Sequence, residues 1–331
     1  MASGIGGSAE GFKAGRRWLS WALAAALVAL AFTFVDLNKV YEALFAIPSS
    51  YIIIGVVICV ADRVLMALRW FLLIRGLGGR VSFFSVGIAS LKSNTMSMLV
   101  HSIAGDLTKI AYMRRQLDIH SIIIPSLVAD RMIGLIAVIP LGTCGFIYLG
   151  FAEQNDLHLS RAMQMIMVSA AILLTIIIIL LIVRSTGVPR KKAVFSPVLE
   201  WIGSITRIVQ MRFWLWVILM VAVLRQCLGI LLVLAYVTYI DGDADVLSLL
   251  SIIALQFVIM RLPISPDGWG VGELTAVSLY GLANVQPEAA LVAMLLFHAV
   301  YWIACLPGLA LVFWDGDRLT GSPRRIAAAS P

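Results

Sequence analysis

The stretch RLPISPDGWGVGELTAVSLYG, residues 261 to 281, stands between two strongly apolar segments, where a membrane helix would be expected to continue. Its prolines remove backbone hydrogen-bond donors, and its glycines allow backbone conformations that end a helix. Backbone freed in this way is tolerated at membrane depth only where protein or water satisfies it. We therefore expect residues 263 to 272 to line a hydrated cavity, with a half-helix beginning near Gly272 and Glu273 and presenting its N–H groups there.

The composition is that of an integral membrane protein. The chain has 331 residues, of which 61% are hydrophobic and 13% charged, and its mean hydropathy is +0.98; soluble domains have about 25% charged residues. Apolar runs such as 163–183 reach the roughly 20 residues that a helix needs to cross a bilayer. We predict an all-α, polytopic membrane fold with six full spans, at residues 18–35, 51–74, 119–139, 163–183, 213–240 and 288–313. The sequence leaves open whether the third span continues past Pro140 to residue 151.

The placement of the basic residues predicts the orientation. With these spans, segments on one side hold 17 Lys and Arg residues and segments on the other side hold Lys39 and Arg161. Because basic loops stay in the cytoplasm, we expect both termini to be cytoplasmic and the protein to reside in the cytoplasmic membrane. The apolar run of the first span is too long for a signal peptide, so we expect it to be retained.

Two further apolar segments are interrupted by polar and flexible residues. Segment 82–105 has arginines or lysines on both flanks, which predicts a re-entrant hairpin from the inside. Segment 247–283 has acidic or uncharged flanks, which predicts a hairpin from the outside. Residues 1–151 and 152–331 thus contain the same order of elements in opposite orientation, and such an inverted-topology repeat is typical of transporters.

Charged side chains lie inside the predicted membrane segments, where each arginine costs roughly 2.5 to 3.5 kcal/mol. Some belong to a repeated VADR sequence, at 60–63 and 128–131. Neighbouring residues on a helix point about 100° apart, so we expect neither aspartate to neutralise the arginine that follows it. A phosphate would suit this cationic cluster, because guanidinium groups bind phosphate with two parallel hydrogen bonds.

The candidate site residues form three groups. We expect a lipid headgroup to be bound by Arg63, Arg131, Arg225 and Arg261. The group that shapes the hairpins and the cavity contains Asn94, Gly105, Asp106, Pro263, Gly268, Gly270, Gly272 and Glu273. Asp130 and His298 are candidates for a proton relay, although an intramembrane histidine more often serves in packing.

Other chemistry finds little support in the sequence. The four cysteines are scattered through apolar spans without a metal or disulfide spacing, and GWGVG lacks the spacing and the preceding strand of a nucleotide loop. No nucleophile and base stand at a recognisable spacing. We therefore expect no enzyme activity, no cofactor and no nucleic-acid partner, despite a net charge of +7.

Three motifs carry a family resemblance: PISPDGWGVGE (263–273), ADRMIGLI (129–136) and ALRW (67–70). They are similar to the second-hairpin motif, the acidic-Arg-x-x-Gly-Leu helix and the early Leu-Arg-Trp of the lysylphosphatidylglycerol synthase transmembrane family, flippase-like proteins also called uncharacterised protein family 0104. The first hairpin departs from that family, because only Asn94 and Gly105-Asp106 match and HSIA replaces its proline and extra glycine. The resemblance covers nearly the whole chain.

The resemblance implies a lipid translocase. Members fused to an aminoacyl-phosphatidylglycerol synthase move its product to the outer leaflet; here the soluble domain is expected to be absent, so a separate enzyme would make the lipid. We expect a flippase for an anionic or zwitterionic phospholipid or a polyprenyl phosphate, with a homo-oligomer also compatible. Two alternatives stay open: an intramembrane enzyme or accessory factor acting on polyprenyl-phosphate-linked sugars, with Asp106 or Glu273 as base, and an ion-coupled transporter of small solutes.

Overall fold

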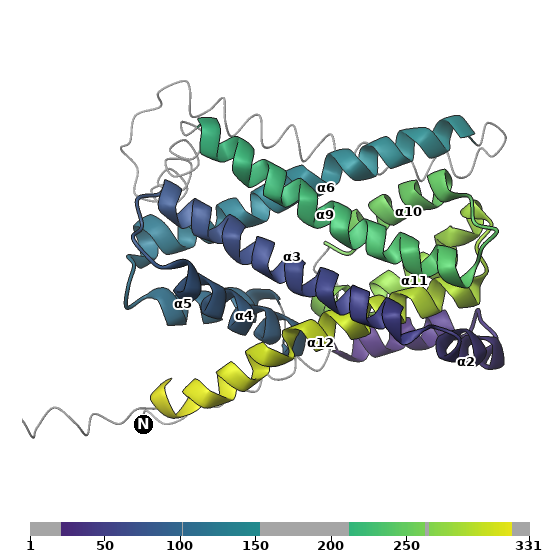
Figure 1. The fold of residues 1–331 in the computed structure, drawn as a ribbon, viewed down its shortest axis with the longest axis horizontal. Helices are drawn as coiled ribbons and strands as arrows, with labels where there is room; N and C mark the ends of the chain where they lie inside the picture. The colour runs from purple at the N-terminus through teal and green to yellow at the C-terminus, as the bar shows by residue number, and fades with distance from the viewer. Residues whose placement is uncertain (1–20, 101, 153–211, 262–264, 320–331) are drawn as a thin grey trace, which may run out of the picture.

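The computed structural model describes residues 21–100, 102–152, 212–261 and 265–319, and within these ranges the protein is helical and contains no strand (Figure 1). The elements that form the body of the molecule are α2 (Leu37–Phe45), α3 (Ser49–Gly76), α4 (Phe83–Leu99), α5 (Ser102–Met113), α6 (Ile124–Ala152), α9 (Arg212–Ile240), α10 (Val246–Ile259), α11 (Val271–Leu279) and α12 (Pro287–Leu319). The prediction of an all-α membrane fold is confirmed at this level.

Four segments are long and apolar enough to cross a bilayer: Ser49–Gly76, Ile119–Gly145, Phe213–Ile240 and Pro287–Val312. The second begins with a π-helical turn, Ile119–Ile123, and α6 then continues through Pro140 without a break. Asp118 caps this turn, and hydrogen bonds from the Ser121 side chain and backbone hold the pKa of the Asp118 carboxyl below its usual range. The predicted span 163–183 lies outside the described residues.

Of the predicted first span, 18–35, the structure describes the part from residue 21 onward, which is helical as far as Phe32. The chain then bends by 98° into α2, and among the described residues Trp21–Phe32 and α2 meet the length and composition of a span when they are taken together. Asp36 starts α2 by accepting a hydrogen bond from the Asn38 backbone N–H, at 2.9 Å. Along α2, Val40 is buried while Tyr41 and Phe45 are exposed, so this short helix packs one side against the rest of the protein.

Both interrupted segments form helical hairpins. In Figure 1, α4 and α5 lie side by side in one half of the molecule, whereas α10 and α11 lie in the other half, and both hairpins turn near the middle of the long helices. The predicted inner boundary at residue 105 is wrong, because α5 continues to Met113. Residues 106–113 contain neither proline nor glycine, and nothing there ends the helix.

The helices pack in a reciprocal pattern. α10 packs against α6, α4 packs against α12, and α3 packs against α9. Glycines allow the close approaches: a Cβ on Gly145 of α6 would lie 2.6 Å from the backbone oxygen of Ser251, and one on Gly308 of α12 would lie 2.6 Å from that of Leu91. Each hairpin is therefore held by the last long helix of the other half of the chain.

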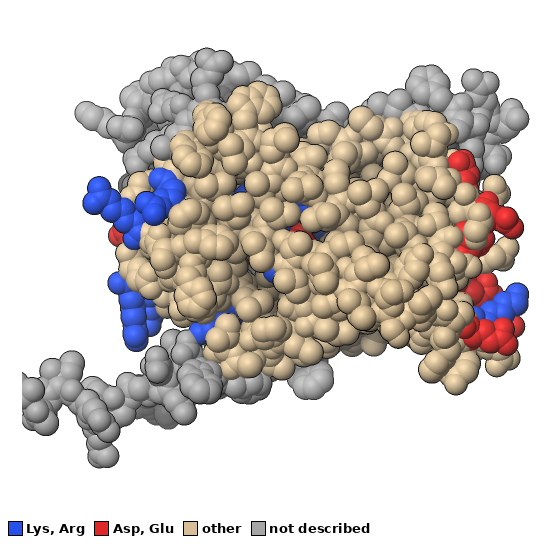
Figure 2. Space-filling model, in the orientation of Figure 1, with Lys and Arg blue, Asp and Glu red and all other residues tan. Residues whose placement is uncertain are grey.

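The two ends of the molecule carry opposite charge. Figure 2 shows lysines and arginines gathered at one end and aspartates and glutamates at the other, with the surface between them largely uncharged. We call them the basic end, with exposed Arg75, Arg80, Arg114 and Arg115, and the acidic end, with Asp36, Glu42, Asp241, Asp243, Asp245 and Glu288. The inner hairpin starts and finishes at the basic end, and the outer hairpin at the acidic end.

Candidate functional site

A cavity of about 430 Å³ lies where the two hairpins meet. Its wall includes Asn94 and Asp106 of the inner hairpin and Ser265 and Gly268 of the outer turn, together with residues of α3, α6 and α9. A smaller cavity of about 120 Å³ adjoins it. The two share a wall formed by Arg225, Met260, Arg261, Asp267 and Tyr301.

The outer turn reaches the cavity through a short left-handed stretch. Asp267, Gly268 and Gly270 have φ angles of 51°, 82° and 78°, a region that glycine adopts without strain and aspartate tolerates. Ser265, Asp267 and Gly268 line the large cavity, which agrees with the expectation for this turn. Pro263 lies outside the described residues.

The other two predicted glycines of this turn do not line either cavity. A Cβ on Gly270 would lie 2.6 Å from the backbone oxygen of Ala24, so Gly270 allows the turn to touch the first helix. A Cβ on Gly272 would lie 2.9 Å from the Met294 methyl carbon. Both glycines therefore serve close packing around the hairpin.

Glu273 is buried beside the turn and organises it from behind. One carboxylate oxygen accepts the Gly270 N–H at 2.7 Å, which caps α11, and the other lies 2.8 Å from Nδ1 of His298 on α12. The Trp269 ring stacks on the imidazole, with ring centroids 4.5 Å apart. His298 lines the small cavity, and its buried Nε2 has no hydrogen-bond partner among the described residues.

The inner hairpin contributes one cavity carboxylate and one close contact. Asp106, in the first turns of α5, lines the cavity and forms an ion pair with Arg131 of α6. Gly105 faces α4, where a Cβ would lie 2.0 Å from the Ser97 hydroxyl and 2.7 Å from the Ser93 carbonyl oxygen. Asn94 is buried in α4 and lines the cavity.

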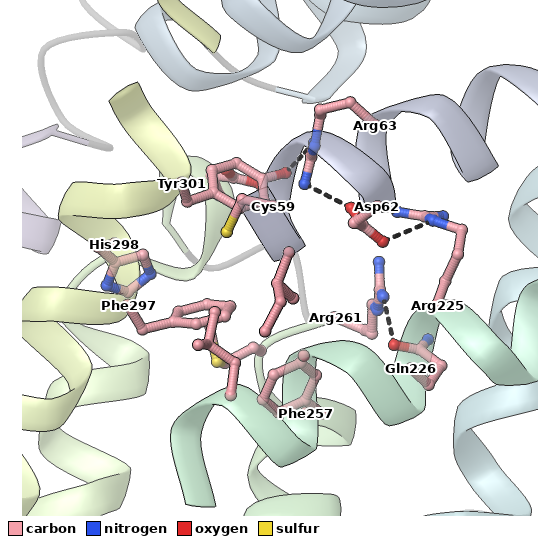
Figure 3. A pocket seen from close by; sticks show the side chains of 15 residues that line it. Cys59, Asp62, Arg63, Arg225, Gln226, Phe257, Arg261, Phe297, His298 and Tyr301 are labelled. Carbon is pink, nitrogen blue, oxygen red and sulfur yellow. Dashed lines mark hydrogen bonds and ion pairs between the residues drawn. The ribbon is translucent and has the colours of Figure 1, made fainter. Parts of the chain in front are cut away.

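Asp62 of α3 is shared by two arginines (Figure 3). Arg225 donates to both of its carboxylate oxygens, at 2.8 and 3.1 Å, and Arg63 lies 2.7 Å from one of them. The expectation that Asp62 would not neutralise Arg63 is therefore wrong. The two Cα–Cβ directions do diverge, but the arginine side chain is long enough to bring its guanidinium back to the carboxylate. Arg63 also donates to the Tyr301 hydroxyl at 2.5 Å.

The second VADR sequence behaves as expected. Asp130 accepts a hydrogen bond from Arg69 of α3 at 2.7 Å, and Arg131 pairs with Asp106 instead. Arg69 is buried in the interior, tied to α6 by this ion pair. Asp130, a candidate for a proton relay, is thus held by Arg69 across the helix interface, and it lines the large cavity.

Arg261 differs from the other arginines of the site. Among the described residues, no carboxylate lies within 4.0 Å of its guanidinium; the side chain donates to Oε1 of Gln226 at 3.1 Å. It is exposed and lines both cavities, at the end of α10 near the middle of the molecule. An accessible guanidinium without a counter-ion at this depth can bind an anion.

Residues 17–308 match the lysylphosphatidylglycerol synthase TM region. The chain belongs to this family. The match includes both hairpins and α12 as far as residue 308, and therefore every described residue that lines the two cavities. Among curated proteins, none matches the chain.

Within this lysylphosphatidylglycerol synthase TM region, the site contains residues that sequence reasoning did not select. They include Asp62, Arg69, Lys109, Gln226, Asp267 and Tyr301. Asp62 belongs to the first VADR sequence, and Asp267 lies in the stretch 263–272 that is expected to line the cavity, but neither is among the predicted site residues. Helical spacing gives a signal for Tyr301, which lies three residues after His298 on the same face of α12.

Proposed function

We propose that the protein is a lipid translocase that moves a phosphate-bearing headgroup between the leaflets of the cytoplasmic membrane. The observation that carries this proposal is the central cavity between two broken hairpins from opposite ends of the molecule, with the guanidinium of Arg261 exposed in it. A lipid supplies a phosphate for such a site and two acyl chains that can remain in the bilayer. Membership of the family supports a lipid-related role.

The phosphate is held first by Arg261, with two parallel hydrogen bonds. Arg225 and Arg131 stand on the same cavity wall, each paired with an aspartate. These ion pairs can open in favour of the phosphate as the headgroup passes, because phosphate offers the same bidentate geometry as a carboxylate. The aspartates hold the arginines in place when the cavity has no lipid.

Alternating access between the two halves is part of the proposal. The reciprocal packing of α4 on α12 and of α10 on α6 supports an inverted repeat, in which either hairpin can open while the other closes. The basic end would face the cytoplasm, with both termini there. The protein would work on membrane lipids made by a separate enzyme and would catalyse no covalent step.

Reconstitution into vesicles with fluorescent phospholipids tests the proposal. We expect the wild-type protein to equilibrate labelled lipid between leaflets, measured by dithionite quenching, and Arg261→Gln to slow this at least about tenfold, since one charge-assisted contact is lost. Arg80→Gln, an exposed change at the basic end, should leave the rate unchanged. Unaltered leaflet distribution across a panel of phosphate-bearing lipids, with folded protein, would refute the function.

A further inference from the structure

The net charge of the two joined cavities indicates which kind of phosphate fits. The described residues that line them include six cations, namely Arg63, Arg69, Lys109, Arg131, Arg225 and Arg261, and four carboxylates, namely Asp62, Asp106, Asp130 and Asp267. With His298 neutral, the described lining thus has an excess of two positive charges. Ion pairs within the set do not change this excess. At membrane depth such an excess is unfavourable until an anion offsets it.

Two of these six lining cations have no described carboxylate within ion-pair distance. Arg261 is one, and Lys109 of α5 is the other: among the described residues no carboxylate lies within ion-pair distance of its ammonium, which sits 4.5 Å from the centre of the Trp70 ring. Lys109 is buried and lines the large cavity on the side of the inner hairpin. Arg261 lines the same cavity from the outer hairpin, so the two cations come from opposite hairpins.

Buried polar groups without a hydrogen-bond partner also indicate an anionic ligand. The buried Nδ2 of Asn94 and Oγ of Ser265 have no hydrogen-bond partner within the described ranges, although both residues line the large cavity. An amide N–H and a hydroxyl both donate, as do the guanidinium and the ammonium. The described part of the site therefore has hydrogen-bond donors that are not taken up by its own acceptors. Such a site suits a ligand rich in oxygen acceptors.

We propose that the cavity prefers a lipid phosphomonoester over phosphodiester and zwitterionic headgroups, an inference that rests on the proposed lipid function. A phosphomonoester carries about −1.5 to −2 charges at pH 7 and three acceptor oxygens. It offsets the excess charge nearly completely, whereas a phosphodiester offsets half of it and a zwitterionic headgroup none. Asp267, the carboxylate of the shared wall, further disfavours a second phosphate, because it would repel the additional negative charge.

A binding experiment on the purified full-length protein tests this preference. The thermal unfolding midpoint is followed at pH 7.5 against dioctanoyl phosphatidate, dioctanoyl phosphatidylglycerol and dioctanoyl phosphatidylcholine, which share their chains and differ in headgroup. Glycerol 3-phosphate is the arm without chains. We expect phosphatidate to act at about tenfold lower concentration than phosphatidylglycerol, because one more unit of charge is neutralised in a medium of low dielectric constant, and phosphatidylcholine to be weakest.

The outcomes separate this inference from the function. Equal concentrations for phosphatidate and phosphatidylglycerol, or a stronger effect of phosphatidylcholine, overturn the preference even if lipids are translocated. If glycerol 3-phosphate is as effective as phosphatidate, the monoester preference stands, but the ligand is a soluble ester and the lipid function falls.

Two variants change the charge in opposite directions. Lys109→Met removes one positive charge, so the advantage of phosphatidate over phosphatidylglycerol should fall from about tenfold to near parity, whereas Lys109→Arg should keep it. Asp267→Asn removes a negative charge and should tighten the binding of both lipids; asparagine tolerates the positive φ of this position. Lys39→Gln, exposed at the acidic end, is the control. An unchanged preference in Lys109→Met and unchanged binding in Asp267→Asn would together overturn the charge argument.

Discussion

At the scale of single residues, Asp62 stabilises the cationic wall, by which we mean the cavity wall that contains Arg63 and Arg225, when no ligand is bound. Its carboxylate takes hydrogen bonds from Arg225 and lies against Arg63, and its side chain is 15% exposed. Two guanidinium groups therefore depend on one acid in the interior. Removing one partner of a buried ion pair leaves an uncompensated charge, which costs more than the pair itself contributes.

We expect Asp62→Asn to lower the free energy of unfolding by about 3 to 5 kcal/mol, the usual cost of breaking a buried pair. Denaturant titration of the purified protein, followed by circular dichroism, measures it. Asp243→Asn, an exposed change at the acidic end, should cost less than about 0.5 kcal/mol. The double variant Asp62→Asn with Arg225→Gln should recover part of the loss. If Asp62→Asn is as stable as the control, the shared carboxylate does not stabilise the wall.

Residue-level reasoning from sequence found the charges but not their partners. The buried arginines of the headgroup group could be recognised because charge is costly in an apolar segment. Their pairing could not, since Asp62 to Arg225 spans 163 positions and Asp130 to Arg69 spans 61. The error at Asp62 and Arg63 has a local cause: helix geometry fixes the Cα–Cβ direction, whereas an arginine guanidinium lies several bonds beyond it.

At the scale of elements, glycine contacts set how closely the hairpins approach the long helices. Gly308 of α12 faces α4, where a Cβ would lie 2.4 Å from the Thr95 hydroxyl and 2.6 Å from the Leu91 carbonyl oxygen. The second neighbour is backbone and cannot rotate away. Thr95 also donates a hydrogen bond to the Cys305 carbonyl oxygen across this contact, at 3.2 Å. The contact therefore fixes the inner hairpin to α12.

We expect Gly308→Ala to destabilise the protein by about 1 to 3 kcal/mol, because α12 and α4 must move apart to admit a methyl group. Gly87→Ala is the matched control, since Gly87 lies in α4 with nothing within 4 Å of its added Cβ. That control should be neutral or gain up to about 1 kcal/mol from the better helix propensity of alanine. Thermal unfolding of both variants compares them; equal midpoints would show that the close contact does not limit the packing.

The elements themselves were largely predictable. Apolar length placed α3, α9 and α12 within about two residues at each end apart from the C-terminal end of α12, and the proline and glycine cluster placed the outer break. The inner break, at residues 100–101, has no proline or glycine to mark it. Beyond this break α4 and α5 pack closely at Gly105, a contact that the local sequence does not reveal.

At the scale of the whole molecule, the opposite charges of the two ends and the opposite directions of the two hairpins describe one arrangement. The inner hairpin opens from the basic end and the outer hairpin from the acidic end, and α3 packs against α9 between them. Each hairpin packs against the last long helix of the other half, α4 against α12 and α10 against α6. The large cavity therefore has lining residues from both halves of the chain.

This arrangement predicts which end faces the cytoplasm. Lys39 is exposed on α2 at the acidic end, and Arg80 is exposed between α3 and α4 at the basic end. By the positive-inside rule, we expect Lys39→Cys to react with a membrane-impermeant maleimide that reaches the outer face of an intact cytoplasmic membrane. Arg80→Cys should react only after the cytoplasmic membrane is permeabilised. The unsubstituted chain measures any labelling of its native cysteines. Labelling of Arg80→Cys before that of Lys39→Cys would reverse the orientation and require the inner hairpin to open toward the outside.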